Sequence, residues 1–196
     1  MEIQEKNIVA AYKAADESGK NLLKALFPAV SFDQQEVDNR PVTERIKTFD
    51  DALEALGEDN PFVAMYRTIA CNYHYDRTTA QMFAYAKLQV VVAALNEGWE
   101  PEFTENEWRW YPWFYLYTQD ELDEKDEEWK QKRALQLVGD NYQTEYCGFA
   151  FADSGSAPSN APAYVGSRLC LKDEATARYC GTQFAELWAD FYLMRK

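Results

Sequence analysis

The chain has 196 residues, 47% of them hydrophobic and 15% aromatic, which is ample material for a buried core and argues against disorder of the whole chain. Its 33 acidic and 20 basic residues give a formal net charge of −13. Such a charge repels phosphate backbones, so nucleic acid is disfavoured as a partner and a basic protein surface is an easier one.

The first twenty residues are charged and lack an apolar signal core, and no apolar run approaches the roughly 20 residues that cross a bilayer. The four cysteines, Cys71, Cys147, Cys170 and Cys180, form no CxxC pair. These features predict a cytoplasmic protein with free thiols and no membrane partner.

The N-terminal segment carries helical patterns in two places. Ile8, Ala11, Tyr12 and Ala15 recur at helical spacing, and the apolar residues of 22–27 suggest a second short helix that ends at a proline. The polar stretch "DQQEVDNRP" (33–41) reads as a linker. We therefore expect residues 1–40 to form a helical segment with its linker, and residues 41–196 to form a single α+β domain.

The helical part of that domain, residues 43–97, has clear start and stop signals. Thr48 can cap a helix that ends at Gly57, and Asn60 followed by proline can begin the next one. A longer helix is predicted from about residue 79 to 96. Its "VVVAAL" run has strand propensity, but the continuous helical spacing favours a helix.

Residues 99–196 contain the predicted sheet. Strands are expected in "EWRWYPWFYLY" (107–117), "EYCGFAFAD" (145–153) and "VGSRLCLKD" (165–173). A charged helix is expected at 119–138, a surface loop at 152–163 and a closing helix after Asp173. The whole predicts an α+β fold in which the helical N-terminal half packs on a small antiparallel sheet covered by the C-terminal helix.

The stretch "NEWRWYPWFYLYTQDE" (106–121) holds three tryptophans, three tyrosines and a phenylalanine. In an alternating strand, Trp108, Trp110 and Phe114 face one side, whereas the tyrosines and Trp113 face the other. Pro112 requires an edge position or an interruption, because it cannot donate to the ladder. One aromatic face can join the core, and the second needs the charged helix, a second subunit or a partner as cover. We expect an interface.

Three stretches together carry a resemblance: "TERIKTFDDALEALG" (43–57), "VVAALNEGWEPEFTENEWRWYPWF" (91–114) and "VGSRLCLKDEATARYCGTQFAELWADF" (165–191). They resemble uncharacterised proteins encoded by phages and prophages of anaerobic gut bacteria. The resemblance implies a phage or mobile-element origin and a host-cell cytosol. No activity is established for that group, so the resemblance assigns no catalytic residue.

No complete catalytic or cofactor motif occurs in the sequence. The only histidine, His74, lies three residues after Cys71, and neighbours on one helix face aim outward rather than at each other. That pair supplies two of the four ligands of a structural zinc site, and the other cysteines have no matching spacing. Neither GxxxxGK[ST] nor GxGxxG is present. We therefore expect no metal, no cofactor and no enzyme, with a Cys71 or His74 hydrolase as a remaining alternative.

One group of residues combines cations with flat aromatic surfaces. Guanidinium groups grip phosphate or carboxylate, and aromatic faces stack on bases or other flat groups. If the strands at 107–117 and 165–173 share a sheet, these side chains gather in one place, and the alternative is that each arginine pairs with a nearby acid. The candidate binding residues are Arg109, Trp110, Tyr111, Trp113, Tyr115, Ser167 and Arg168.

Two functions follow from these observations. The first is a non-enzymatic, phage-encoded accessory protein that binds a protein partner or forms a homo-oligomer through the aromatic strand. The alternative is a protein that binds a small, nucleotide-like molecule through the arginines and aromatic rings. Single-stranded nucleic-acid binding ranks below both, because the chain has no strongly basic segment.

Overall fold

The computed structural model describes residues 5–28, 30, 38–72, 76–158 and 167–196. The chain divides into two compact units, Met1–Arg40 and Pro41–Lys196. Four predictions fall wholly or partly outside the described residues: His74, residues 33–37 of the 33–41 stretch, the end of the 152–163 loop and the start of the strand at 165–173. Each unit is described by itself.

The first unit contains two helices, α1 (Glu5–Ala14) and α2 (Glu17–Leu26). Asp16 caps α2, because its carboxylate accepts a hydrogen bond from the backbone N–H of Gly19 at 2.8 Å. The ammonium groups of Lys20 and Lys24 lie 6.0 and 5.4 Å from the centre of the Tyr12 ring. The helical prediction for this segment is confirmed.

The second unit begins with α3 (Val42–Arg45), α4 (Phe49–Leu56) and α5 (Pro61–Cys71). The predicted caps are confirmed. Thr48 and Asp51 form a reciprocal capping box at the start of α4, and Gly57 ends it with a φ of +74°. The side chain of Asn60 accepts from the N–H of Phe62 at 2.9 Å.

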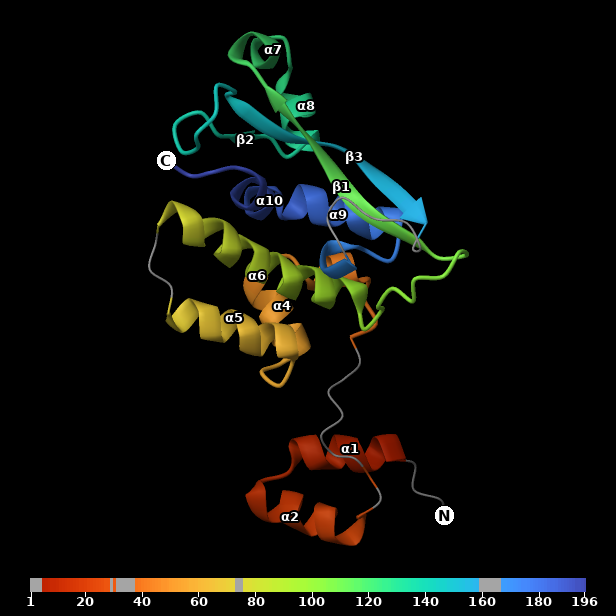
Figure 1. Ribbon diagram of the computed structural model, residues 1–196. Coiled ribbons are helices and arrows are strands. Elements are labelled where there is room, and N and C mark those ends of the chain that lie inside the picture. Colours follow the sequence, from red (N-terminus) through yellow and green to blue (C-terminus); the bar gives the residue numbers. More distant parts are fainter. Residues whose placement is uncertain (1–4, 29, 31–37, 73–75, 159–166) are drawn as a thin grey trace. The chain divides into compact units, whose positions relative to one another are not determined.

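Helix α6 (Arg77–Asn96) is the central element of the second unit. Its second half, including the "VVVAAL" run, is helical as predicted, and Gly98 follows it with a φ of +85°. The residues from Leu88 to Val92 are all buried, which explains why no single apolar stripe dominates. In Figure 1, α4 and α5 pack on one side of this helix and α10 (Ala185–Tyr192) on the other.

Three antiparallel strands form the sheet, in the order β1–β3–β2. The long strands are β1 (Trp108–Tyr117) and β3 (Gly148–Pro158), and β2 (Gln136–Leu137) is a two-residue edge strand. Their register shifts between Trp113 and Phe114, where β3 contains one extra residue, Ala152.

The edge position that Pro112 requires is confirmed, because β1 is an outer strand of the sheet. Trp110 exchanges both backbone hydrogen bonds with Leu171, on the side facing away from β3. Pro112 lies two residues further along, so its nitrogen also points away from β3. The missing N–H therefore removes no bond between the two long strands.

Helices α9 (Glu174–Gln183) and α10 cover one face of the sheet, and α6 packs against their opposite side (Figure 1). The α+β prediction is confirmed. The helical half packs against the sheet largely through these C-terminal helices, which lie between α6 and the strands.

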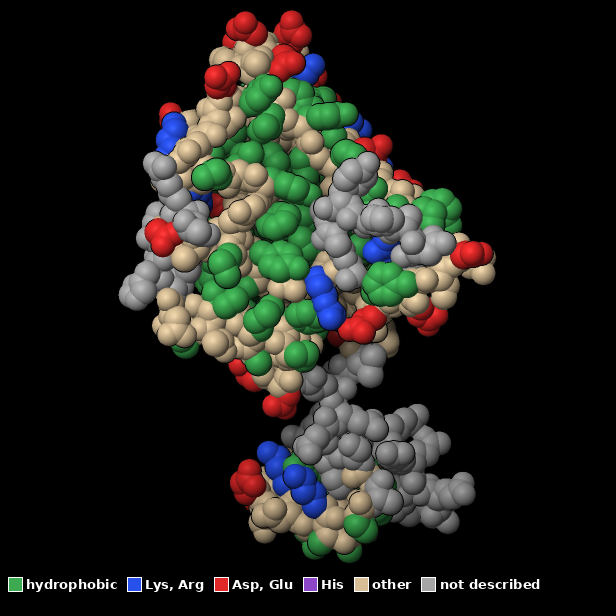
Figure 2. Space-filling view, viewed as in Figure 1, with side chains coloured by type: hydrophobic (Ala, Val, Ile, Leu, Met, Phe, Trp, Pro, Cys, Tyr) green, Lys and Arg blue, Asp and Glu red, His purple; other side chains and the backbone are tan. Residues whose placement is uncertain are grey.

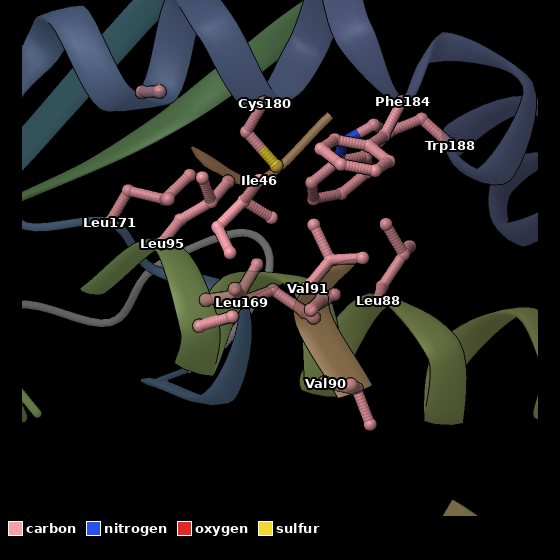
Figure 3. Close-up of a cluster of buried hydrophobic side chains, with 14 of the residues drawn as sticks. Ile46, Leu88, Val90, Val91, Leu95, Leu169, Leu171, Cys180, Phe184 and Trp188 are labelled. Atoms are coloured by element: carbon pink, nitrogen blue, oxygen red, sulfur yellow. The ribbon is translucent and has the colours of Figure 1, made fainter. Parts of the chain in front are cut away.

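The main core fills the space between α6 and the C-terminal helices, as Figure 3 shows. Three side chains point toward α6: Cys180 from α9, Phe184 from the junction of the two helices and Trp188 from α10. The ring of Trp188 also lies 5.7 Å from that of Phe114 in β1, so this side chain joins the sheet to the helices. The labelled partners are Ile46, Leu88, Val91, Leu95, Leu169 and Leu171, whereas Val90 points to the other side of α6.

The predicted strand at 165–173 is wrong for the residues that the structure describes. Residues Ser167–Leu169 form a 3-10 turn, and only Leu171 pairs with β1, in an isolated bridge. Leu169, Cys170 and Leu171 are consecutive and all buried, which an alternating half-exposed strand cannot achieve. The side chain of Asn96 binds this segment, donating to the carbonyl of Cys170 at 2.9 Å and accepting from the N–H of Lys172 at 3.1 Å.

The single helix predicted at 119–138 is also wrong. The Thr118–Glu121 capping box is present, but α7 (Gln119–Asp123) is short, and Asp126 begins a separate helix, α8 (Glu127–Lys132). The carboxylate of Asp126 accepts from the N–H of Trp129 at 2.7 Å, so this residue acts as a cap rather than as a helix interior.

Two other boundaries differ from the prediction. The loop expected at 152–163 is a strand up to Pro158, because Ser154–Pro158 pair with the first half of β1. The closing helix is broken at Phe184, whose φ and ψ of −114° and 30° separate α9 from α10. The remainder of the expected loop lies outside the described residues.

Gly181 lies inside α9, where glycine costs roughly 1 kcal/mol relative to alanine. A Cβ atom at this position would lie 2.6 Å from Pro112 Cβ and 2.6 Å from Phe151 Cδ2. The glycine therefore allows close contact between helix and sheet, as its position in the sequence predicts. The neighbouring rings are those of Pro112 and Phe151.

The four free cysteines differ widely in accessibility. Cys71 is exposed, whereas Cys170 and Cys180 are buried, and burial raises the pKa of the Cys180 thiol to about 12. We expect iodoacetamide at pH 8 to label Cys71 rapidly, Cys147 more slowly, and the two buried thiols only after unfolding. Peptide mass spectrometry over a time course measures the order. Rapid labelling of Cys180 in the folded protein would contradict the described core.

Candidate functional site

The two faces of β1 have different surroundings. Trp110, Pro112 and Phe114 face the C-terminal helices, and the Phe114 ring stacks on Phe149 at 4.6 Å between ring centres. On the opposite face, the rings of Tyr111 and Trp113 lie 5.9 Å apart. The predicted division into a core face and a second aromatic face is therefore correct for these residues.

An apolar groove of about 390 Å³ runs along the outer edge of β1, between this strand and the end of α10. Figure 2 shows hydrophobic side chains gathered over this part of the molecule. The groove carries little polar surface, and no charged side chain lines it. Its lining residues are Tyr111, Pro112, Trp113, Phe114, Tyr115, Leu116, Phe149, Tyr192 and Leu193.

The backbone of β1 along this groove forms an open strand edge. Among the described residues, the backbone hydrogen bonds on this side of the strand are those between Trp110 and Leu171. Antiparallel strands alternate their bonding direction, so the N–H and C=O groups of Phe114 and Leu116 point the same way as those of Trp110. These groups lie beside the groove and can accept another strand.

Within the described part of the chain, β1 has no partner on this side beyond Trp110, because the three residues at 167–169 do not continue the pairing of Leu171. Continuing the antiparallel register from the Trp110–Leu171 bridge would place residues 167–169 opposite 112–114. Those residues instead form the 3-10 turn that buries Leu169 in the core. Burial of this leucine therefore removes the strand that would otherwise cover β1.

Two aromatic side chains border the groove while remaining accessible. Trp113 is 43% exposed, and Tyr115 is 64% exposed. The indole of Trp113 lies directly over Gly155 of β3, where a Cβ atom would be 2.0 Å from the indole nitrogen. Glycine at 155 therefore leaves room for the indole beside Tyr111, where it forms one wall of the groove.

Negative charge lies close to one end of the groove. Helix α7 begins two residues after β1 ends and carries Asp120, Glu121 and Asp123, all exposed. Acidic side chains are visible over α7 at the top of Figure 2. A partner with a basic side chain at this end would be favoured over an acidic one.

The structure separates the residues that the sequence groups together. Arg109 is buried, and its guanidinium lies 5.4 Å from the centre of the Phe103 ring and beside Cys170. Arg168 lies 5.5 Å from the Phe62 ring centre, and it pairs with Glu100 at 3.9 Å. The arginines therefore do not share the groove with Trp113.

The other predicted residues are divided in the same way. Tyr111, Trp113 and Tyr115 line the groove, whereas Trp110 packs on the core. Ser167 begins the 3-10 turn. The sequence missed Phe149, Tyr192 and Leu193, which reach the groove from β3 and the end of α10. In the sequence, these three residues differ from their neighbours only in being apolar. That property does not distinguish a residue that lines a groove from one that is buried in the core.

Within the described residues, no group of three or more His, Cys, Asp or Glu side chains could hold a metal ion. The Cys71–His74 pair cannot be assessed, because His74 lies outside that part of the chain. None of the helices described is both long enough and apolar enough to cross a membrane.

Comparison of the chain with protein families, with characterised proteins and with solved structures gives no match. The phage or prophage origin therefore stays a prediction, based on the three stretches that carry the resemblance.

Proposed function

We propose that the protein is a non-enzymatic interaction protein that binds an extended segment of a partner protein along the outer edge of β1. The observation that supports this function is the open strand edge at Phe114 and Leu116 beside an apolar groove of about 390 Å³. In strand addition, the exposed backbone groups supply affinity, and pockets for alternate side chains supply specificity.

The charge of the protein favours a different chain over a second copy as the occupant. Two copies would each bring a formal net charge of −13. The acidic residues of α7 would also lie close to the added strand. We therefore propose a partner segment with alternating apolar residues, which fill the groove, and a basic residue near α7.

A display library of random eight-residue peptides, selected on the intact protein, tests this proposal. We expect the selected peptides to alternate apolar residues and to carry Lys or Arg near one end. Bound peptide should slow amide hydrogen exchange at Phe114 and Leu116 by at least tenfold, because their N–H groups then join a ladder.

Two tryptophans of the same strand provide the variant and its control. Trp113→Lys places a charge in the groove and should weaken peptide binding at least tenfold. Trp108→Lys changes a tryptophan that is 52% exposed and lies outside the groove, and it should leave affinity within about twofold.

Two results would contradict the proposal. One is slow exchange of Phe114 and Leu116 in the free monomer, since the edge would then be closed. The other is a stable dimer in light scattering in which Trp113→Lys restores the monomer and rapid exchange. That result would identify a second copy as the occupant.

A further inference from the structure

A second apolar hollow, of about 680 Å³, lies between α7, α8 and β2 (Figure 1). It shares no lining residue with the groove along β1. Its leucines come from three segments: Leu122 of α7 is buried, Leu135 after α8 is half-buried, and Leu137 of β2 is 73% exposed. No other large apolar side chain in the described part of the chain is as exposed as Leu137. The hollow therefore presents apolar surface that the described chain does not cover.

The surroundings of this hollow are acidic. Residues 119–132, which include α7 and α8, contain seven acidic and three basic residues. Two of the acids line the hollow. Glu127 pairs with Lys130 at 2.8 Å, but its side chain is 89% exposed, so this pair is weak. Asp123 accepts from the side-chain amide of Gln119 at 2.7 Å and forms no ion pair among the described residues. An occupant with Lys or Arg beside its apolar residues is therefore favoured.

The backbone around the hollow favours a helix over an added strand as the occupant. The carbonyls of Leu122 and Lys130 already accept from the N–H groups of Lys125 and Leu135, at 3.1 and 3.0 Å. Strand β2 has only two residues, so it offers an added strand little backbone to pair with. A helix forms its backbone hydrogen bonds internally and binds an apolar groove through side chains at i, i+3, i+4 and i+7.

We propose that this hollow binds a basic amphipathic helix of a partner protein. Apolar residues of the helix pack on Leu135 and Leu137, and its Lys or Arg residues lie beside Asp123 and Glu127. A second copy of the chain is a less favourable occupant, because each copy has a formal net charge of −13. This surface is independent of strand addition at β1.

Three fluorescein-labelled peptides of about sixteen residues test the two requirements, with binding followed by anisotropy at about 150 mM salt. The first peptide has leucines on one helix face and lysines beside them. The second has the same composition with its leucines spread around the helix, and the third has glutamate in place of lysine. We expect the first to bind at least tenfold more tightly than either of the others, and to gain helical circular dichroism on binding.

Two exposed leucines provide the variant and its control. Leu137→Lys places a cation in the hollow and should weaken binding of the first peptide at least tenfold. Leu26→Lys makes the same change at a side chain that is 60% exposed and lies in the other compact unit, so it should leave affinity within twofold. Both variants should unfold at the urea concentration of the parent, because both side chains are largely exposed.

A second pair of variants tests the charge requirement. Asp123→Asn should weaken binding of the first peptide at least threefold and reduce the loss of affinity between about 50 and about 200 mM salt. Asp59→Asn removes the same charge from an exposed residue between α4 and α5, and it should leave both quantities unchanged.

Equal binding of the first two peptides, or equal binding by Leu137→Lys and Leu26→Lys, would overturn the proposal, because charge alone would then attract the peptide. No saturable binding of the first peptide up to about 1 mM would overturn it as well. A dimer in light scattering that Leu137→Lys dissolves would do the same, since a second copy would be the occupant. Trp113→Lys should bind the first peptide as the parent does, so this experiment and the peptide selection can fail independently.

Discussion

Replacing Trp188 with alanine is expected to lower the free energy of unfolding by about 3–5 kcal/mol, because a fully buried large side chain leaves a cavity. Trp188 is 0% exposed, and its ring lies 5.8 Å from that of Tyr192 and 5.7 Å from that of Phe114. Domains of this size are stable by about 5–15 kcal/mol, so the variant should be close to unfolding. Urea denaturation followed by circular dichroism measures the change.

Trp113→Ala is the matched control for that experiment. It removes the same side chain from an exposed position on the sheet, so we expect a loss of no more than about 1 kcal/mol. Similar losses in both variants would contradict a core in which Trp188 joins the sheet to the helices.

Gly181→Leu is expected to destabilise the protein by about 2–3 kcal/mol. Even the first added carbon would lie 2.6 Å from both Pro112 and Phe151, so the helix and the sheet must separate. Overpacking typically costs about 1–3 kcal/mol, and the better helix propensity of leucine returns less than about 1 kcal/mol. The midpoint of urea unfolding at constant slope gives the difference.

Ala175→Leu is the control, because it introduces leucine at an exposed position of the same helix. It should change the free energy of unfolding by no more than about 0.5 kcal/mol. If Gly181→Leu unfolds at the same urea concentration as the parent, α9 does not dock on the sheet through Gly181. The orientation of the groove beside α10 would then be in doubt as well.

The buried thiol of Cys180 and the partly exposed phenol of Tyr192 give the fold a dependence on alkaline pH. Burial raises the pKa of Cys180 from 9.0, and that of Tyr192 from 10.0, to about 12 in each case. A raised pKa in the folded state stabilises the fold fully below the unfolded pKa. That contribution is lost as the pH rises from about 9 to 12, so stability should fall over this interval.

The sequence by itself determined the helix starts and the strand position that depend on residues a few positions apart. The capping box at Thr48, the Asn60–Pro61 start and Asp173 as the cap of α9 depend on hydrogen bonds within one turn, and all are present. Pro112 restricted β1 to a sheet edge or an interruption, because proline has no N–H to donate, and the structure has the edge. The close approach at Gly181 could be predicted too, since glycine inside a helix needs a reason.

The tertiary structure decided what depends on residues far apart in the chain. Leu169 and Leu171 have the composition of a strand, but burial of both, with the backbone held by Asn96, replaces the strand with a turn. That turn leaves the edge of β1 at Phe114 and Leu116 without a paired strand among the described residues, and the end of α10 supplies the facing wall of the groove.

The contrast between local and long-range contacts also explains which candidate site residues the sequence could group correctly. The sequence predicted an interface at the aromatic strand, because both of its faces are aromatic, and named Tyr111, Trp113 and Tyr115, which line the groove. It could not place Arg109 in the interior beside Cys170, or Arg168 in the same cavity as Phe62 and Val92, since those positions depend on packing between segments more than 60 residues apart. Propensity and capping act within a few residues, whereas side chains from distant segments meet only where the core brings them together.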